Sequence, residues 1–459
     1  MKPSVTTHKK GKGMRDKILS LSKFAHWLDG YKSFWHSLRC QKVTIPPNLA
    51  DTILAQKFNE RSEEWWKDIV GQYFTPLRAS GILVEADIDR NLLLNATQIA
   101  QPDQIQGLYL IVAKECNLVC DYCLYGTKAS GSMNKSGETM MSESVALRAI
   151  DCFSQVTRNN HHYDSYWQQI TFYGGEPLLN FATIQAATEW TKQLQNRGDI
   201  WEHTRIVINS NGVLIDWQTA VWLAHENIEI QISLDGFRST HDRHRITRLG
   251  GGSYHDALRG LKFLCKAGTV VVPMITLNED NLDSLPDFIY WLCSEFPIQS
   301  YGMNILMSTT GDCRVDYPLM AARAMWNANK ATQPLGVQDD CFVDTLNAFA
   351  GLQITPQRCG AGKKITVFPD GSLHTCQALE NSGLTDIGKL PVFNEQSSNW
   401  TAWSNRSRFQ NPECLTCPVL GACGGGCAAG SYHANGDISA IDPNICQWTK
   451  ALFEIWLSS

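Results

Sequence analysis

The chain has 459 residues and a net charge of -5, enough length for two to four domains of about 100–200 residues each. The charge gives no sign of nucleic acid or anionic membrane as a partner, and no apolar run approaches the ~18 residues of a membrane span. Sixteen cysteines in a chain whose first 20 residues lack the apolar segment of a signal peptide predict a cytoplasmic location, with thiolates kept for iron rather than for disulfides.

The first hundred residues predict a mainly helical extension. A polar, basic tail at 1–17 is followed by apolar and aromatic residues at roughly helical spacing over 18–45. Helices are expected at 48–59 and 62–79, the second bent or ended near Pro76, and a short strand at 81–85.

From residue 106 onward, strands and helices alternate, which predicts parallel βα units. Strands are expected at 108–113, 168–173, 204–209, 228–234, 269–277 and 301–307, with helices at 142–156, 181–194, 216–225, 253–267, 283–294 and 319–332. Six units predict an α/β fold built on a partial (β/α)6 TIM barrel. Active sites of such barrels gather at the C-terminal ends of the strands, and each motif of this region lies at such an end.

The loop KECNLVCDYCLYG, residues 114–126, carries Cys116, Cys120 and Cys123 in CX3CX2C spacing after the first strand. A structural zinc site takes four protein ligands, whereas three thiolates can hold a [4Fe–4S] cube and leave one iron open to a small molecule. Tyr122 offers a stackable face beside that iron. The alternatives are a zinc knuckle or three incidental cysteines.

Further motifs follow at the ends of later strands. The motif Gly174-Gly175-Glu176-Pro177 has glycines that let the backbone approach a ligand, and the backbone N–H groups would then meet that ligand. The alternative is that the motif is only a tight βα turn. The stretch SLDGFRSTHDRHR, residues 233–245, ends in Arg245, whose guanidinium suits a carboxylate ligand or a surface ion pair.

Together these motifs resemble those of the radical S-adenosylmethionine (radical SAM) enzymes. The resemblance implies that Cys116, Cys120 and Cys123 bind a [4Fe–4S] cluster, that SAM chelates its open iron, and that the reduced cluster cleaves SAM to a 5′-deoxyadenosyl radical. The SAM contacts that it implies are Tyr122 and Leu306 at the adenine, Gly174, Gly175 and Glu176 at the amino acid part, Ser210 and Asn211 at the ribose, Ser233, and Arg245 at the carboxylate. A core position is the alternative for Leu306.

The C-terminal region holds a second set of seven cysteines: Cys359, Cys376, Cys414, Cys417, Cys423, Cys427 and Cys446. Cys414 and Cys417 alone resemble half of a zinc ribbon. The whole set, with the strand–turn–strand text ITVFPDGSLHT, resembles the SPASM extension of radical SAM peptide-modifying enzymes. That resemblance implies two auxiliary [4Fe–4S] clusters, one on Cys414, Cys417, Cys423 and Cys446 and one on Cys359, Cys376 and Cys427, so three clusters in all.

Two fully protein-bound cubes need eight ligands, and the pattern supplies seven. Cys341 and Cys313 are candidates for the eighth; otherwise the iron stays open or takes a non-cysteine ligand or the substrate. Cys40, Cys152, Cys265 and Cys293 lie in apolar helical contexts and are expected to be small buried hydrophobes.

The predicted domains are an N-terminal extension at 1–100, the radical SAM partial barrel at 101–335 and a SPASM domain at 336–459. In many related peptide maturases, a winged-helix-like module at the first position binds the leader of a precursor peptide by strand addition. The extension here is compatible with such a module, and the alternative is a helical cap that binds nothing.

The resemblance implies a maturase that oxidatively cross-links side chains of a ribosomal precursor peptide, with flavodoxin or ferredoxin as reductant. The alternatives are an anaerobic sulfatase maturase, which forms formylglycine from Cys or Ser, and a non-catalytic metal scaffold. Sulfatase maturases usually begin close to their first cluster and carry an aspartate base where this chain has Gln377. Candidates for the general base here are Asp340, His374, Glu380 and Asp370, and the sequence does not choose among them.

Overall fold

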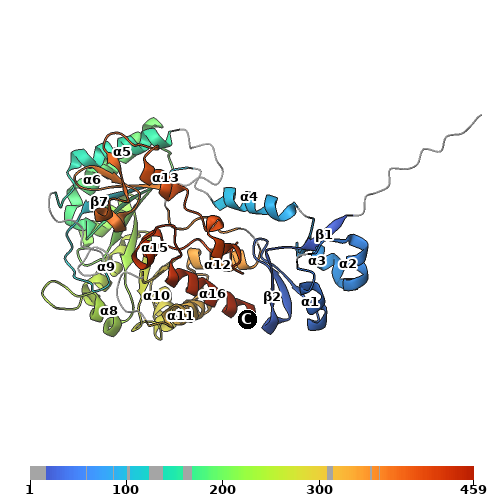
Figure 1. Cartoon of the computed structure of the whole chain (residues 1–459). Coiled ribbons are helices and arrows are strands. Elements are labelled where there is room, and N and C mark those ends of the chain that lie inside the picture. The colour runs from blue at the N-terminus through green and yellow to red at the C-terminus, as the bar shows by residue number, and fades with distance from the viewer. Residues whose placement is uncertain are drawn as a thin grey trace, which may run out of the picture.

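The computed structural model describes residues 17–57, 59–85, 87–100, 104–123, 138–158, 168–307, 314–351, 354–360 and 362–459. Most of the basic tail, residues 1–16, lies outside these ranges. Within them, no helix has both the length and the apolar composition needed to cross a bilayer. An N-terminal module, a barrel-like α/β region and a C-terminal region follow one another along the chain (Figure 1).

The α/β region confirms the predicted partial barrel. Its strands are β7 (Gly107–Ala113), β8 (Gln169–Gly174), β9 (Arg205–Ser210), β10 (Glu229–Ser233), β11 (Val271–Leu277) and β12 (Gly302–Ile305). They lie in that order, and each pair of neighbours is parallel. The helices are α5 (Glu143–Thr157), α6 (Phe181–Arg197), α7 (Trp217–His225), α8 (Arg238–His244), α9 (Tyr254–Ala267), α10 (Leu285–Glu295) and α11 (Tyr317–Thr332). All six expected strands and helices are present, and the short helix α8 is an addition within the SLDG stretch.

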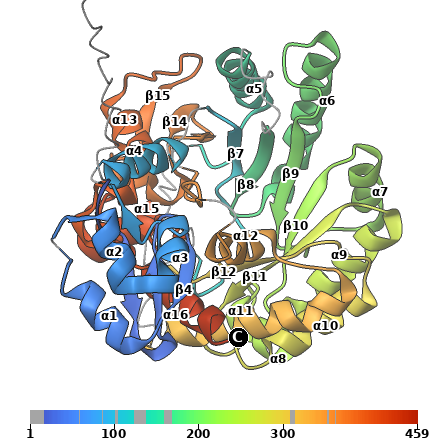
Figure 2. The ribbon, with the colours of Figure 1, turned by 90° about the vertical axis from the view of Figure 1, so that its right-hand side faces the viewer.

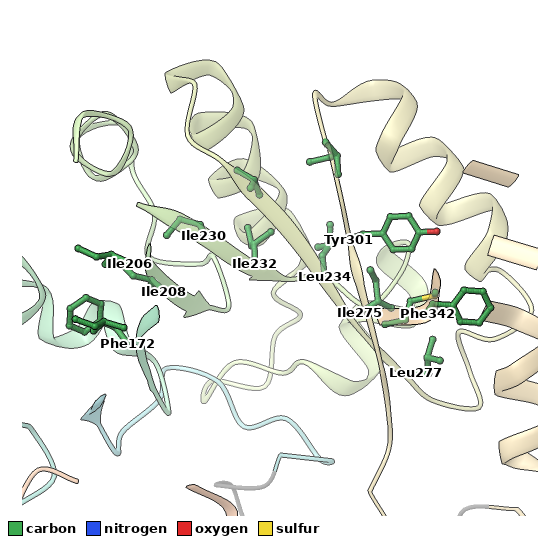
Figure 3. Close-up of a cluster of buried hydrophobic side chains, with 14 of the residues drawn as sticks. Phe172, Ile206, Ile208, Ile230, Ile232, Leu234, Ile275, Leu277, Tyr301 and Phe342 are labelled. Carbon is green, nitrogen blue, oxygen red and sulfur yellow. The ribbon is translucent and has the colours of Figure 1, made fainter. Parts of the chain in front are cut away.

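Branched apolar residues on alternate positions of these strands build the core. Ile206, Ile208, Ile230 and Ile232 are at most 6% exposed and lie in one continuous cluster with Phe172 (Figure 3). Each side chain buried in this way stabilises the fold by about 1.5–3 kcal/mol. This packing fixes the strands side by side and brings their C-terminal ends to one edge.

The C-terminal region extends the barrel sheet rather than forming a separate one. Strand β13 (Lys364–Val367) pairs parallel with β7, and β14 (Ser372–His374) and β15 (Asp386–Lys389) continue the sheet antiparallel. The predicted strand, Pro-Asp-Gly turn and strand are confirmed, with Gly371 at a φ of +80° in the turn. The remaining helices are α12 (Asp340–Phe349), α13 (Ser398–Ser404), α14 (Pro412–Leu415), α15 (Ala428–Asn435) and α16 (Pro443–Ser458).

The helical pattern expected over 18–45 is wrong, because this segment forms four strands. They are β1 (Ile18–Leu21), β2 (Ala25–Leu28), β3 (Ser33–His36) and β4 (Gln41–Thr44). All four residues of β3 are buried, so its apolar run reflects burial on both faces rather than a helical stripe. Lys32 and Cys40 have positive φ angles of 47° and 50°, in the turns that separate β2, β3 and β4.

The helices of the N-terminal module are α1 (Pro47–Leu54), α2 (Glu63–Val70), α3 (Phe74–Ala79) and α4 (Ile88–Ala100). The predicted bend near Pro76 is wrong, since the break between α2 and α3 lies at Gly71, whose φ is +52°. Pro76 instead lies in the first turn of α3, where its missing N–H costs no helical hydrogen bond. The short strand is confirmed as β6 (Leu83–Val84), which joins β5 (Arg61–Ser62) and β1 in a sheet of order β5-β1-β6.

The N-terminal module packs on the C-terminal region (Figures 1 and 2). The Trp35 indole donates to the carbonyl of Pro418 at 2.6 Å and lies against Phe453 of α16. Phe24 and Leu38 share an apolar cluster with Phe409. The strands of the N-terminal module are therefore anchored beside the C-terminal cysteines, and the domain boundaries drawn from the sequence stay a prediction.

Candidate functional site

The loop after β7 brings the three cysteines of the CX3CX2C motif together. Burial raises the pKa of the Cys120 thiol to about 12, opposed by the Arg245 guanidinium and reinforced by the thiols of Cys123 and Cys116. Burial likewise raises the pKa of Cys116 to about 11. Residues 124–126 of the predicted loop lie outside the described ranges. Three converging thiols fit the donor set of a cube with one open iron.

The segment after α8 holds this loop in place. The N–H of Val119 donates to the carbonyl of Ile246 at 2.7 Å, and Leu118 forms an isolated bridge with Thr247. The Arg248 guanidinium donates to the carbonyl of Cys116 at 2.7 Å. Sequence reasoning missed Arg248, because nothing marks a residue three positions after Arg245 as a partner of a loop 132 positions away.

The two glycines of Gly174-Gly175-Glu176 make close contact with the cysteine loop. The N–H groups of Gly175 and Glu176 donate to the carbonyls of Ala113 and Glu115, each at 2.8 Å. A Cβ would lie 2.1 Å from the Ala113 oxygen at Gly174, and 2.2 Å from the Glu115 oxygen at Gly175. The expectation that these N–H groups meet a ligand is corrected for Gly175, which donates to the end of β7, and for Glu176, which donates to the loop backbone.

Replacing Gly175 with alanine is therefore expected to displace the cysteine loop. A shift of ~1 Å can cost ~10²-fold in rate, so cleavage of SAM is expected to fall about 100-fold. The measurement is 5′-deoxyadenosine formation by reconstituted protein. Gly30→Ala is the matched control, since a Cβ there meets nothing within 4 Å. A Gly175→Ala variant as active as Gly30→Ala would contradict this account.

The Glu176 carboxylate ties the ends of β8 and β9 together. It accepts from Ser210 Oγ at 2.9 Å, the Asn211 N–H at 2.8 Å and the Leu178 N–H at 3.1 Å. Burial raises its pKa to about 7, although these three donors oppose the shift. The Asn211 amide in turn donates to Asn117 at 2.7 Å and to the Cys116 sulfur at 3.7 Å. Contacts of Glu176 and Ser210 with a cofactor stay a prediction; in this structure their side chains bind each other.

A buried ion pair lies beside the cysteines. Two guanidinium nitrogens of Arg245 donate to the Asp235 carboxylate, at 2.8 and 3.1 Å, and the Tyr122 hydroxyl donates to the same carboxylate. Burial opposes ionisation of Asp235, but the Arg245 guanidinium, with the Tyr122 hydroxyl and His241, outweighs it and holds the pKa below its usual value. Two of the five N–H donors of Arg245 are used here, so others are left for a ligand carboxylate. Asp235 belongs to the SLDG motif, but sequence reasoning did not predict that its carboxylate pairs with Arg245.

Ser233 and Leu306 lie half-buried at the ends of β10 and β12. The Leu306 N–H donates to the Tyr317 hydroxyl at 2.9 Å, and the Leu306 carbonyl accepts from the Asn444 side chain at 3.1 Å. Both residues therefore stand at the edge where the other motifs gather, and their contacts with SAM stay a prediction.

A second group unites Cys359, Cys376 and Cys427, the three cysteines that the resemblance to the SPASM extension grouped. The thiols of Cys359 and Cys427 share a hydrogen bond, which with other nearby groups pulls the pKa of Cys359 well down and that of Cys427 well up. Cys376 packs in the same apolar cluster. Burial lowers the pKa of the nearby Lys364, but Tyr109 and the three thiols outweigh it and leave the pKa raised.

A third group unites Cys414, Cys417, Cys423 and Cys446. Burial raises the pKa of Cys414 to about 12, and the thiols of the other three members add to the shift. The Lys450 ammonium hydrogen-bonds to Cys446, whose charge raises the pKa of Lys450. In the described ranges, no three His, Cys, Asp or Glu side chains surround one point as ligands of a single metal ion do. Each of the three groups consists of thiols, the donors that iron–sulfur clusters take.

The other cysteines have ordinary packing roles. Cys40, Cys152 and Cys293 are buried, and Cys265 packs against the main core. Cys341 is exposed at the start of α12 among Asp339, Asp340, Asp344 and Arg358, and no thiol of the two auxiliary groups is among these neighbours. Cys313 lies outside the described residues.

Comparison with known families identifies the α/β region. The model of the Radical SAM superfamily matches residues 110–292. These residues form a radical SAM domain. Such a domain uses SAM and a [4Fe–4S] cluster, and its relatives catalyse radical reactions, so the chain is an enzyme.

Curated relatives of the radical SAM domain include two kinds of enzyme. The chain is 23% identical over 366 residues to the radical SAM cyclopropyl synthase TigE of Paramaledivibacter caminithermalis, covering 77% of this chain and 74% of TigE. It is 25% identical over 179 residues to a serine-type anaerobic sulfatase-maturating enzyme of Bacteroides thetaiotaomicron, covering 39% of this chain and 40% of that enzyme.

Solved structures show the same fold. SuiB of Streptococcus suis bound to its precursor peptide SuiA matches with a TM-score of 0.55 and 14% identity, over 94% of this chain and 98% of SuiB. The protein anSMEcpe with bound AdoMet matches with a TM-score of 0.63 and 18% identity, over 76% of this chain and 92% of anSMEcpe.

The candidate general bases lie in different surroundings. Asp340 and Asp370 are exposed. His374 is buried between the hydroxyls of Thr385 and Ser372, and burial lowers its pKa to about 4. Glu380 forms an ion pair with Lys114, two residues before Cys116. Glu380 is thus the candidate that contacts the loop of the radical SAM domain.

Proposed function

We propose that this enzyme is a peptide maturase, which uses SAM and a cluster at Cys116, Cys120 and Cys123 to cross-link side chains of a ribosomal precursor peptide oxidatively. The proposal includes two auxiliary [4Fe–4S] clusters, one on Cys359, Cys376 and Cys427 and one on Cys414, Cys417, Cys423 and Cys446. Flavodoxin or ferredoxin would supply the electron for SAM cleavage.

The extent of the structural likeness carries this proposal. The match to SuiB spans 94% of the chain, whereas the match to anSMEcpe spans 76%. The difference is about the size of the N-terminal module, which a sulfatase maturase is not expected to have. SuiB was solved with its precursor peptide, and anSMEcpe with the Cp18Cys peptide, which supports a peptide substrate here.

When bound, the reduced cluster and SAM supply a 5′-deoxyadenosyl radical that abstracts a hydrogen atom from an unactivated carbon. Joining two side chains removes two hydrogen atoms from the peptide. One leaves in 5′-deoxyadenosine, and the other leaves as a proton and an electron. The chain therefore needs a base for the proton and an acceptor for the electron. The clusters proposed on the two C-terminal cysteine groups would be that acceptor.

Glu380 is the base that we favour. Its carboxylate pairs with the Lys114 ammonium, and the two side chains are only 12% and 5% exposed. Lys114 begins the first cluster loop, and Glu380 lies four residues after Cys376, so the pair joins the segments that carry the two cysteine groups. Gln377, where sulfatase maturases carry a base, accepts a hydrogen bond from Lys364 at 2.9 Å and has an amide that cannot take a proton.

The N-terminal module is the proposed site for the leader of the precursor. Within the described sheet, β6 is an edge strand that pairs only with β1. A cavity of about 480 Å³ beside it is lined by apolar and charged residues, among them Phe74, Leu83, Arg78 and Glu85. An extended peptide can add to such an edge through backbone hydrogen bonds while its side chains enter the cavity.

Mass spectrometry of a small peptide encoded beside the gene, co-expressed under low oxygen, tests the function. The expected product is lighter by two hydrogen atoms per cross-link, and fragmentation is blocked between the joined residues. Conversion of serine to formylglycine gives the same mass loss, but it leaves fragmentation intact and gives an aldehyde that reacts with hydrazine. The core peptide without its leader, as the matched control, is expected to be modified poorly. An unmodified peptide alongside active SAM cleavage, or an aldehyde product, would contradict cross-linking.

A further inference from the structure

The auxiliary group of Cys359, Cys376 and Cys427 supplies three thiols. A [4Fe–4S] cube has four irons, so one iron of this proposed cluster has no cysteine ligand. The groups that act on the Cys341 thiol at the start of α12 are Asp339, Asp340, Asp344 and Arg358, and none of the three thiols is among them. A fourth protein ligand from the described residues would therefore be another kind of donor.

A methionine sulfur stands beside this group. The Cys427 thiol donates to the Met307 sulfur at 3.5 Å. Met307 also packs in the apolar cluster that contains Cys359 and Cys376. It follows β12 by two residues, so it reaches from the substrate end of the barrel into the C-terminal region. The thioether is thus the fourth sulfur of a group whose other three members are thiols.

Hydrogen bonds hold together the two backbone segments that carry this contact. The Asn444 side chain donates to the carbonyl of Leu306, the residue before Met307, at 3.1 Å. The Asp442 carboxylate accepts from the N–H of Cys427 at 3.0 Å and from the N–H of Asn444 at 3.1 Å. The backbones that carry Met307 and Cys427 are therefore both tied to the first turn of α16.

We propose that the Met307 thioether is the fourth protein ligand of the auxiliary cluster on Cys359, Cys376 and Cys427. This inference rests on the proposed auxiliary clusters. Thioether sulfur is a soft donor that binds iron in proteins, as it does in cytochromes c. A neutral sulfur would close the fourth iron to solvent. The site would then carry one negative charge fewer than a cluster bound by four thiolates.

Selenium X-ray absorption tests the ligation directly. Selenomethionine-labelled protein, reconstituted anaerobically, is compared with labelled Met307→Leu and with labelled Met303→Leu as matched control. Met303 lies on β12 and is buried in the main core, away from the cysteine group. The expected result is an iron scatterer at bonding distance from selenium in the parent and in Met303→Leu, absent in Met307→Leu. A second readout is the EPR signal of the reduced auxiliary cluster after imidazole is added. Imidazole is expected to change this signal in Met307→Leu alone, because only there is the fourth iron open.

The iron content separates the two levels of the proposal. About twelve irons per chain without a selenium–iron contact would overturn the role of Met307 and leave the proposed function standing. About eight irons, unchanged when Cys359, Cys376 and Cys427 are replaced with alanine, would overturn both the auxiliary cluster and its methionine ligand.

Discussion

Replacing Cys116, Cys120 and Cys123 together with alanine is expected to abolish SAM cleavage and to leave about eight of about twelve irons per chain. The three thiols are the protein ligands of the cluster of the radical SAM domain. Without them the cluster does not bind, and SAM has no iron to chelate. The other seven cysteines belong to two groups that none of the three contributes to. Iron content and 5′-deoxyadenosine formation measure the two halves of this expectation separately.

The control is Cys152→Ala, which removes a buried thiol from α5. It is expected to keep its iron and to cleave SAM at close to the parent rate. Any SAM cleavage retained by the triple variant would refute the assignment of the CX3CX2C motif. A fall to about four irons would instead show that one of the two C-terminal clusters depends on the first cluster for assembly.

The barrel could be predicted from the sequence because its signals are local and repeated. Each βα unit pairs a short branched strand with an amphipathic helix, as β9 and α7 do, and packing then follows from the pattern. The N-terminal segment lacked such a signal. Phe34 and Trp35 are adjacent on β3 and both are buried, so their burial on opposite faces imitated the spacing of a helix.

The functional site shows the same contrast between features with a local sequence signal and features without one. Cysteine spacing is a local property that carried the resemblance, and the ten cysteines come together in the three groups that the resemblance implied. The partners that orient them are remote in sequence: Asp235 meets Tyr122, and Arg248 meets Cys116. Met307 lies 120 positions from Cys427, and no motif marks it. Such contacts depend on how the strand ends meet, which requires the fold.

Replacing Asp235 with alanine is expected to destabilise the barrel by about 3–5 kcal/mol, because it leaves a buried guanidinium without its counter-ion. The side chains of Asp235 and Arg245 are 0% and 10% exposed, so water screens the pair little. The Tyr122 hydroxyl loses its acceptor at the same time. The measurement is the urea midpoint of anaerobic unfolding. Asp256→Ala is the control, since it breaks an exposed pair with Arg259 and is expected to cost about 0–1 kcal/mol.

A double variant separates stability from function at this pair. Asp235→Leu with Arg245→Met replaces the ion pair by apolar side chains of similar volume, an exchange that is often neutral or stabilising in buried sites. It is therefore expected to recover most of the urea midpoint lost by Asp235→Ala. SAM affinity is expected to stay low in both variants, because one lacks the guanidinium and the other leaves Tyr122 unanchored. A double variant that regained SAM binding together with stability would show that Arg245 supports the fold alone and does not hold the SAM carboxylate.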